Sequence, residues 1–115
     1  MRTETEKLKE TDLEQFTGTE QYYKHWLGIN YTDGVKYLAD RAGAYWLIDL
    51  IVSYRRKEPF QIWRLEKKDK GWLATMQEDS DQPVLVRQEI EYSDFPLDKI
   101  ELWLIDGVLL LKSEY

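Results

Sequence analysis

Cysteine is absent from this chain of 115 residues, and histidine occurs once, at His25. Without cysteine there is no disulfide, no thiolate nucleophile and no cysteine-ligated zinc. A single histidine excludes the usual catalytic zinc sites and leaves His25 as the only imidazole base for a hydrolase triad. Glycine-rich phosphate loops and the GxSxG nucleophile elbow are also missing. The commonest enzyme signatures are therefore lacking, and we expect neither a metal nor an organic cofactor.

Long apolar runs are lacking as well. The longest lies near Tyr45–Tyr54 and is interrupted by Asp49 and Ser53, whereas a membrane-spanning helix needs about 20 apolar residues. Residues 1–10 are polar and mixed in charge, unlike a signal peptide. We therefore expect a cytoplasmic protein that does not bind membranes, with a flexible N-terminus over residues 1–10 and one domain over residues 11–115.

Basic residues are outnumbered by acidic ones, 16 to 22, which makes the protein acidic with a net charge of −6. Residues 1–57 contain nine of each sign, so the whole excess of 13 acids over seven bases falls in residues 58–115. Because such a surface repels phosphate backbones, we expect no direct nucleic-acid binding. The charge serves solubility in any case, and the partner that it would attract is a protein with a basic surface.

Two helices are predicted in the first half of the chain. Thr32 or Asp33 can cap a helix over residues 33–42, where apolar residues recur at helical spacing, and Gly43 can end it. Residues 44–56 are apolar almost all round, which predicts a buried helix. Both helices precede the strand-like part of the chain.

Shorter elements are predicted before these helices. Thr11 and Glu14 have the spacing of a capping box, and Gly18 is a plausible end for the helix that it would start. The aromatic segment Gln21–Trp26 favours a short strand.

The apolar period changes after Pro59. The alternating segments predict strands at Phe60–Glu66, Trp72–Gln77, Val84–Tyr92, Ile100–Ile105 and Val108–Lys112. Asp106-Gly107 between the last two is typical of a tight hairpin. Helices followed by hairpin-linked strands indicate an α+β fold. We expect N-terminal helices packed on one face of a four- or five-stranded antiparallel meander sheet, with the last strand central or covered on both sides.

Four segments carry a resemblance to a known family: 16–23, 31–39, 42–49 and 108–115. With them the chain, from about residue 13 to its end, resembles an uncharacterised family of short bacterial proteins, a domain of unknown function also found on mobile elements. The resemblance implies a complete small protein. It implies no activity, because none is assigned to the family.

Asp49 is the one acid inside the apolar helix, on a stripe shared with Tyr45 and Ser53. A buried carboxylate is costly unless it is hydrogen-bonded. We therefore expect Asp49 to be mostly buried and to accept a hydrogen bond from a tyrosine hydroxyl, an arginine or backbone amides. The alternatives are a polar point in a binding pocket and a simply exposed helix face.

Aromatic residues are dense between positions 22 and 46, where core packing or a protein-binding surface would use them. The residues that we select as candidates for binding are Tyr22, Tyr23, His25, Tyr31, Asp33, Tyr45, Trp46 and Asp49.

The leading expectation for the whole protein is a non-enzymatic interaction or regulatory module, an accessory protein of a phage or mobile element acting on a host protein. The alternative is a small-ligand-binding domain or an enzyme of weak signature, with a pocket around Asp49, His25 and the N-terminal tyrosines. A homodimer through an aromatic patch or a sheet edge is also open.

Overall fold

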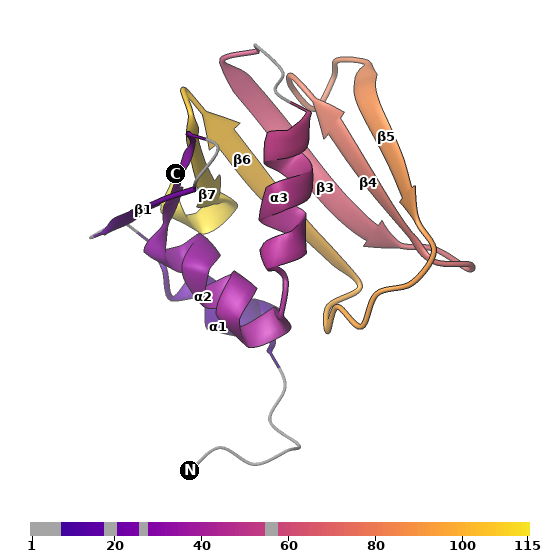
Figure 1. Ribbon diagram of the computed structural model, residues 1–115, viewed down its shortest axis with the longest axis horizontal. Coiled ribbons are helices and arrows are strands. Elements are labelled where there is room, and N and C mark those ends of the chain that lie inside the picture. The colour runs from indigo at the N-terminus through magenta and orange to yellow at the C-terminus, as the bar shows by residue number, and fades with distance from the viewer. Residues whose placement is uncertain (1–7, 18–20, 26–27, 55–57) are drawn as a thin grey trace.

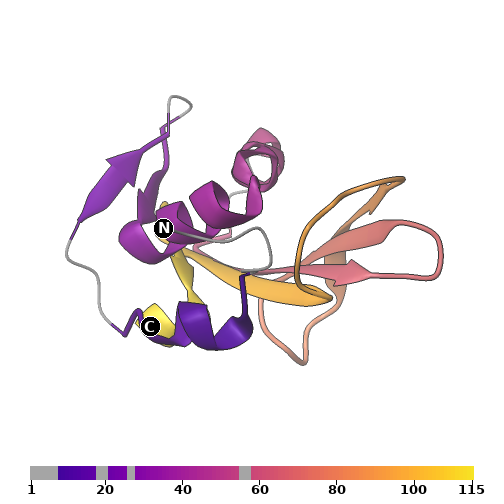
Figure 2. The ribbon, with the colours of Figure 1, turned by 90° about the horizontal axis from the view of Figure 1, so that it is seen from below.

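The computed structural model describes residues 8–17, 21–25, 28–54 and 58–115. These ranges form an α+β protein in which helices α2 and α3 lie together on one face of a seven-stranded sheet (Figures 1 and 2). The helices are α1 (Glu10–Glu14), α2 (Asp33–Ala42) and α3 (Tyr45–Ser53), with a final 3₁₀ turn η1 (Lys112–Glu114). The strands are β1 (Tyr22–Lys24), β2 (Asn30–Thr32), β3 (Phe60–Lys67), β4 (Trp72–Gln77), β5 (Val84–Ile90), β6 (Lys99–Ile105) and β7 (Val108–Leu111).

The sheet is larger than the predicted four or five strands, and it is mixed. Its order is β1-β2-β7-β6-β3-β4-β5. All pairings after residue 60 are antiparallel as predicted, but β2 runs parallel to β7, with Asn30 opposite Val108 and Tyr31 opposite Leu109. Strands of three residues are too short to show a period of two, so the sequence revealed neither their place in the sheet nor this parallel contact.

The sheet is also not a simple meander. After β5 the chain returns across the start of β4, where Trp72 stacks edge-on against Phe95, and β6 then pairs with β3. Phe95 and Leu97 of this connection are buried in the core. β7, between β6 and β2, is buried at three of its four positions, which confirms that the last strand is covered.

The predicted ends of α2 and the predicted turn of the last hairpin are confirmed. The Thr32 hydroxyl accepts a hydrogen bond from the Val35 amide at 3.2 Å, and Gly43 ends the helix in the left-handed conformation with φ 62°. Asp106 and Gly107 have φ of 47° and 83°, the positive values that a tight turn between antiparallel strands requires. Local chemistry decides these boundaries.

The predictions for α1 and for the ends of the chain need correction. α1 begins at Glu10 instead of after Thr11. The capping hydrogen bond at its start runs from the Lys9 amide to the Asp12 carboxylate at 2.9 Å, in place of the expected pairing of Thr11 with Glu14. Gly18, residues 1–7 of the expected flexible segment and residues 55–56 of the expected helix lie outside the described residues. Leu8, within the expected flexible segment, is only 4% exposed.

The core lies between the helices and the sheet. The side chains that the strands contribute alternate with others that face away from α3. They are Trp63, Leu65, Trp72, Ala74, Met76, Val86, Leu102, Leu104, Leu109 and Leu111. From α3 come Leu47, Ile48, Ile51 and Val52. Each large side chain stabilises the fold by about 1.5–3 kcal/mol when fully buried. No helix in the described ranges is long and apolar enough to cross a membrane.

Glu114 attaches the C-terminal turn to the start of α2. Its carboxylate accepts hydrogen bonds from the Thr32 hydroxyl at 2.6 Å, the Leu111 amide at 2.9 Å and the Gly34 amide at 3.2 Å. Glu114 is only 9% exposed, so these bonds offset part of the cost of burying a carboxylate, and the positive end of the α2 dipole adds to them. Glu114 thereby joins the end of the chain to the junction of β2 and α2.

Gly34 is required by this contact. A Cβ on Gly34 would lie 2.6 Å from the Glu114 carboxyl atoms. We expect Gly34→Ala to lower the free energy of unfolding by about 1–3 kcal/mol, the usual cost of overpacking, as measured by urea unfolding. Since the clash is with Glu114, the loss should be smaller in a Glu114→Ala background. A Gly34→Ala variant as stable as the wild type would contradict this account.

The titration of Glu114 should make the fold pH-dependent. Burial raises the pKa of Glu114 and contact with Asp33 adds to this effect, while the hydrogen bonds from Thr32, Leu111 and Gly34 oppose it. A carboxyl whose pKa is raised by folding stabilises the protein below its unfolded value, about 4.3, and this contribution is lost as pH rises through the folded pKa. Glu114→Gln cannot titrate.

The comparison is made between the wild type and Glu114→Gln by urea unfolding from about pH 4 to pH 7. We expect the wild type to lose stability relative to the variant as pH rises. A difference in unfolding free energy that stays constant across this range would show that Glu114 does not titrate as described.

Candidate functional site

Most of the residues selected from the sequence as candidates for binding meet on one surface. This surface, the tyrosine–aspartate patch, is formed where the β1–β2 hairpin meets α2 and α3. Its members are linked by hydrogen bonds, an ion pair and ring contacts: Tyr23, His25, Tyr31, Lys36, Asp40, Tyr45 and Asp49.

The centre of the patch is a chain of contacts from one strand pair to both helices. Tyr23 stacks on Tyr31 with ring centroids 5.7 Å apart. The Lys36 ammonium lies 5.4 Å from the centre of the Tyr23 ring and 2.8 Å from an Asp40 oxygen. The Tyr45 hydroxyl donates to Asp40 at 2.5 Å. Lys36 and Asp40 are one helical turn apart, so α2 presents both on one side.

These contacts fix the charge states at the centre of the patch. The hydrogen bond from Lys36 is the main cause that lowers the pKa of Asp40, and the bond from Tyr45 adds to it. The same bonds to Asp40 raise the pKa of Lys36 and of Tyr45. At neutral pH the patch therefore presents a paired ammonium and carboxylate beside a neutral phenol.

His25 and Asp49 form the other end of the patch. The His25 Nε2 atom lies 2.6 Å from an Asp49 carboxylate oxygen. His25 is 7% exposed, whereas the Asp49 side chain is 63% exposed. The expectation that Asp49 is mostly buried is therefore wrong, and among the described residues its partner is a histidine instead of a tyrosine, an arginine or a backbone amide.

The reason for this error lies in the polar stripe of α3. Tyr45, Asp49 and Ser53 recur every four residues, and all three are exposed. The stripe is visible in the sequence, but the remaining positions are so apolar that they favoured a buried helix. Of the interpretations that the sequence left open for Asp49, the exposed helix face is the one observed.

Asp49 supports the buried imidazole of His25. We expect Asp49→Ala to lower the free energy of unfolding by about 0.5–1.5 kcal/mol, because it removes one hydrogen-bond partner of that imidazole. Asp49→Asn retains an acceptor oxygen and should cost less. Urea unfolding of both variants makes the measurement, and equal losses in the two would show that the hydrogen bond is not what Asp49 contributes.

Three selected residues do not join the patch. Tyr22 is 60% exposed and lies on the face of β1 opposite to Tyr23. Asp33 lies at the start of α2, where its carboxylate accepts from the Gly34 amide at 3.0 Å. Trp46 is half-buried against the core. Conversely, sequence reasoning missed Lys36 and Asp40, although their spacing on the predicted helix was a usable signal.

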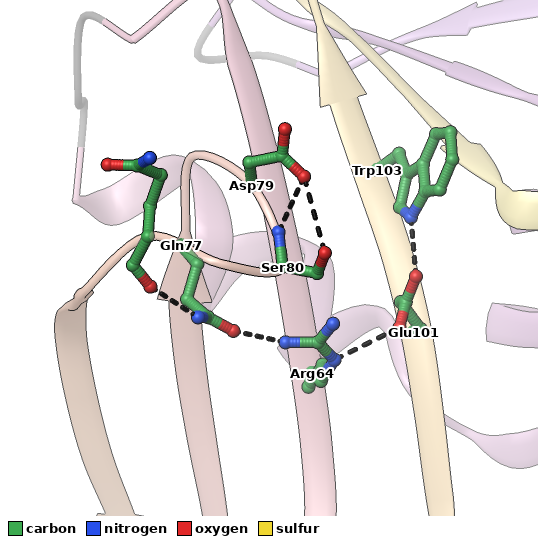
Figure 3. A network of polar contacts seen from close by, with 7 residues as sticks. Arg64, Gln77, Asp79, Ser80, Glu101 and Trp103 are labelled. Atoms are coloured by element: carbon green, nitrogen blue, oxygen red, sulfur yellow. Dashed lines mark hydrogen bonds and ion pairs between the residues drawn. The ribbon is translucent and has the colours of Figure 1, made fainter.

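A second polar cluster lies on the face of the sheet turned away from α3 (Figure 3). The Arg64 guanidinium donates to Glu101 on β6 at 3.0 Å and to Gln77 on β4. The Trp103 indole donates to the same Glu101 carboxylate at 2.7 Å, and the Gln77 amide donates to the Gln82 carbonyl at 2.6 Å. The network ties three strands to the β4–β5 loop.

The electrostatics of Glu101 follow from this network. Burial acts to raise the pKa of Glu101, but the hydrogen bonds from Trp103 and Arg64 outweigh it and the pKa is lowered. Beside the network, Trp103 packs against Phe60 at 5.3 Å and against Tyr115 at 4.9 Å between ring centroids. Phe60, Trp103 and Tyr115 thus form an aromatic row on this face, and the last ring of the row, Tyr115, is 78% exposed.

An open groove of about 740 Å³ lies next to this network. Cations and carboxylates share its lining, which consists of Leu13, Glu14, Arg64, Glu66, Lys99, Ile100, Glu101, Leu111, Lys112 and Ser113. A second groove is lined by residues 67–70 and Asp98. Neither groove includes a residue of the tyrosine–aspartate patch. The described residues also contain no group of three or more histidine, aspartate or glutamate side chains placed to hold a metal ion.

The fold and these surfaces define a small α+β protein with α2 and α3 on one face of a mixed sheet. The chain belongs to DUF6876, a family of unknown function, whose family model matches residues 7–115. Membership of an uncharacterised family, which the resemblance implied, is thereby confirmed, and the family assigns no activity. No curated protein and no solved structure matches the chain significantly.

Proposed function

We propose that this protein is a non-enzymatic interaction module that binds a protein with a basic surface through the tyrosine–aspartate patch. One observation carries the proposal: the exposed carboxylates of Asp49 and Asp40 lie on the same surface as the phenol of Tyr45, which is itself 41% exposed. A carboxylate beside an aromatic ring suits a lysine or arginine side chain, which can pair with the one and stack on the other.

The rigidity of the patch supports this proposal. Lys36, Asp40 and Tyr45 are held to one another on two helices, and Tyr23 and Tyr31 are held on a strand pair. Side chains that are already ordered lose little entropy on binding. Tyrosine is also among the residue types that dominate binding energy at protein interfaces.

The charge of the whole chain acts in the same direction. A net charge of −6 steers a basic partner toward the protein and disfavours nucleic acid. We propose a cytoplasmic regulatory role of this kind, as an accessory protein of a bacterial phage or mobile element that acts on a host protein.

The alternative, a small-ligand-binding domain or an enzyme, has less support. Small ligands favour concave sites with a few convergent polar groups. The pocket expected around Asp49, His25 and the tyrosines corresponds to neither described groove. That pocket stays a prediction.

The test is capture of the partner from the native host with tagged wild-type protein and three variants. Asp49→Asn removes a charge while retaining an acceptor for His25, and Tyr45→Ala removes the phenol. Both should lose the partner. Asp69→Asn makes the same charge change at the exposed β3–β4 turn and should retain it.

The captured protein should have a basic contact surface, and its retention should fall as salt rises, because exposed charge pairs are screened over about 8–10 Å at physiological ionic strength. A partner retained equally by all variants would contradict the use of the patch. A captured small molecule in place of a protein would favour the alternative.

A further inference from the structure

The edge strand β5 is open along its whole length. β5 pairs with β4 on one side, and no described strand pairs with its other side (Figure 1). The opposite edge of the sheet, β1, has three residues, whereas β5 has seven. Val84–Ile90 contains neither proline nor lysine, two residues that commonly protect such an edge, although Pro83 precedes the strand and its register against β4 shifts between Met76 and Gln77.

Apolar side chains gather at this edge. Six large hydrophobic residues of the described ranges are exposed, and three of them lie in β5 or two residues after its end: Val84 at 42%, Leu85 at 39% and Tyr92 at 81%. A long unpaired strand edge flanked by exposed apolar side chains favours strand addition.

The hydrogen-bond alternation shows which backbone groups are available. The Lys68 amide bonds to the Gly71 carbonyl at 2.9 Å and closes the β3–β4 hairpin. Antiparallel pairs alternate, so in the observed registers Ala74 bonds to Gln88, and Arg87 and Glu89 point their backbone groups outward. The Gln88 side-chain amide already donates to the Glu89 carbonyl at 3.1 Å, which leaves this oxygen one further lone pair.

We propose that a second copy of this chain adds to the sheet here, by antiparallel pairing of β5 with β5 across a two-fold axis at Gln88. This register places Arg87 of each copy opposite Glu89 of the other, on the face turned away from α3. It makes Arg87 and Glu89 the hydrogen-bonded pairs, so the outward backbone groups are satisfied. It also places Val86 opposite Ile90 on the core side.

Charge complementarity selects this register over its neighbours. A symmetric antiparallel pair must place one residue opposite itself. With the axis at Arg87 or at Glu89, like charges would face each other, which destabilises strand pairing. Gln88 is the neutral residue between them. The patch lies on the β1–β2 side of the sheet, so the dimer would present two patches, independently of whether the proposed partner is correct.

Sedimentation equilibrium tests the proposal. The wild type should show a reversible monomer–dimer equilibrium. Arg87→Glu and Glu89→Arg, each of which creates two like-charge pairs, should weaken the dimer about tenfold or more. The double variant Arg87→Glu/Glu89→Arg restores opposite charges and should dimerise like the wild type. Lys70→Glu changes the charge equally at an exposed turn and is the control.

Two results overturn the proposal. One is a wild type that stays monomeric up to about 0.5 mM. The other is a dimer that either single variant leaves unchanged, or that the double variant fails to restore while its circular dichroism remains native. Arg87→Pro adds a check that does not depend on charge. It removes an outward amide without touching the β4 ladder, and it should abolish the dimer.

Discussion

The contact between Glu114 and the start of α2 is the constraint on which much of the structure depends. The Glu114 carboxyl group, only 9% exposed, is accommodated there because a hydroxyl and two backbone amides donate to it at the positive end of a helix. It holds η1 against the β2–α2 junction. Gly34 is the matching requirement, since a larger residue would occupy the volume of the carboxyl group. Two segments about 80 residues apart in the chain are thereby held together.

That junction positions the rest of the N-terminal part. With β2 beside β7, the β1–β2 hairpin extends the sheet past its C-terminal strand, and α2 follows directly from β2. Tyr23 and Tyr31 then face Lys36 and Asp40 of α2, and His25 reaches Asp49 on α3. The tyrosine–aspartate patch is thus a consequence of where the short strands attach. The contacts of Tyr23 with Lys36 and of His25 with Asp49 join the strand pair to the two helices, whereas Lys36 and Asp40 pair locally within α2.

The two faces and two edges of the sheet differ in what they leave exposed. The face under α2 and α3 is filled by apolar side chains, while the other carries the Arg64–Glu101 network and the aromatic row of Trp103. At one edge the patch displays ordered polar groups, and at the other β5 displays unpaired backbone and apolar side chains. A surface built for recognition and an edge suited to self-association can therefore act separately.

Much of the local structure could be predicted from the sequence. α2 begins after Thr32 because the Thr32 hydroxyl accepts a hydrogen bond from a free amide of the first turn. It ends at Gly43 because glycine readily adopts the left-handed conformation. Asp106-Gly107 determined the last hairpin, and alternation located the strands from β3 to β7 within a few residues. The aromatic density and the lone acid of α3 also marked most members of the patch, although they did not show that Asp49 is exposed.

Only the tertiary structure decided the rest. The parallel contact of β2 with β7, the buried role of Glu114 and the pairing of His25 with Asp49 all join residues far apart in the chain. Propensity and periodicity are properties of neighbouring residues, so they determine where an element begins and which side is apolar. They do not determine which distant element completes a hydrogen bond or covers a strand, because that choice depends on the packing of the whole chain.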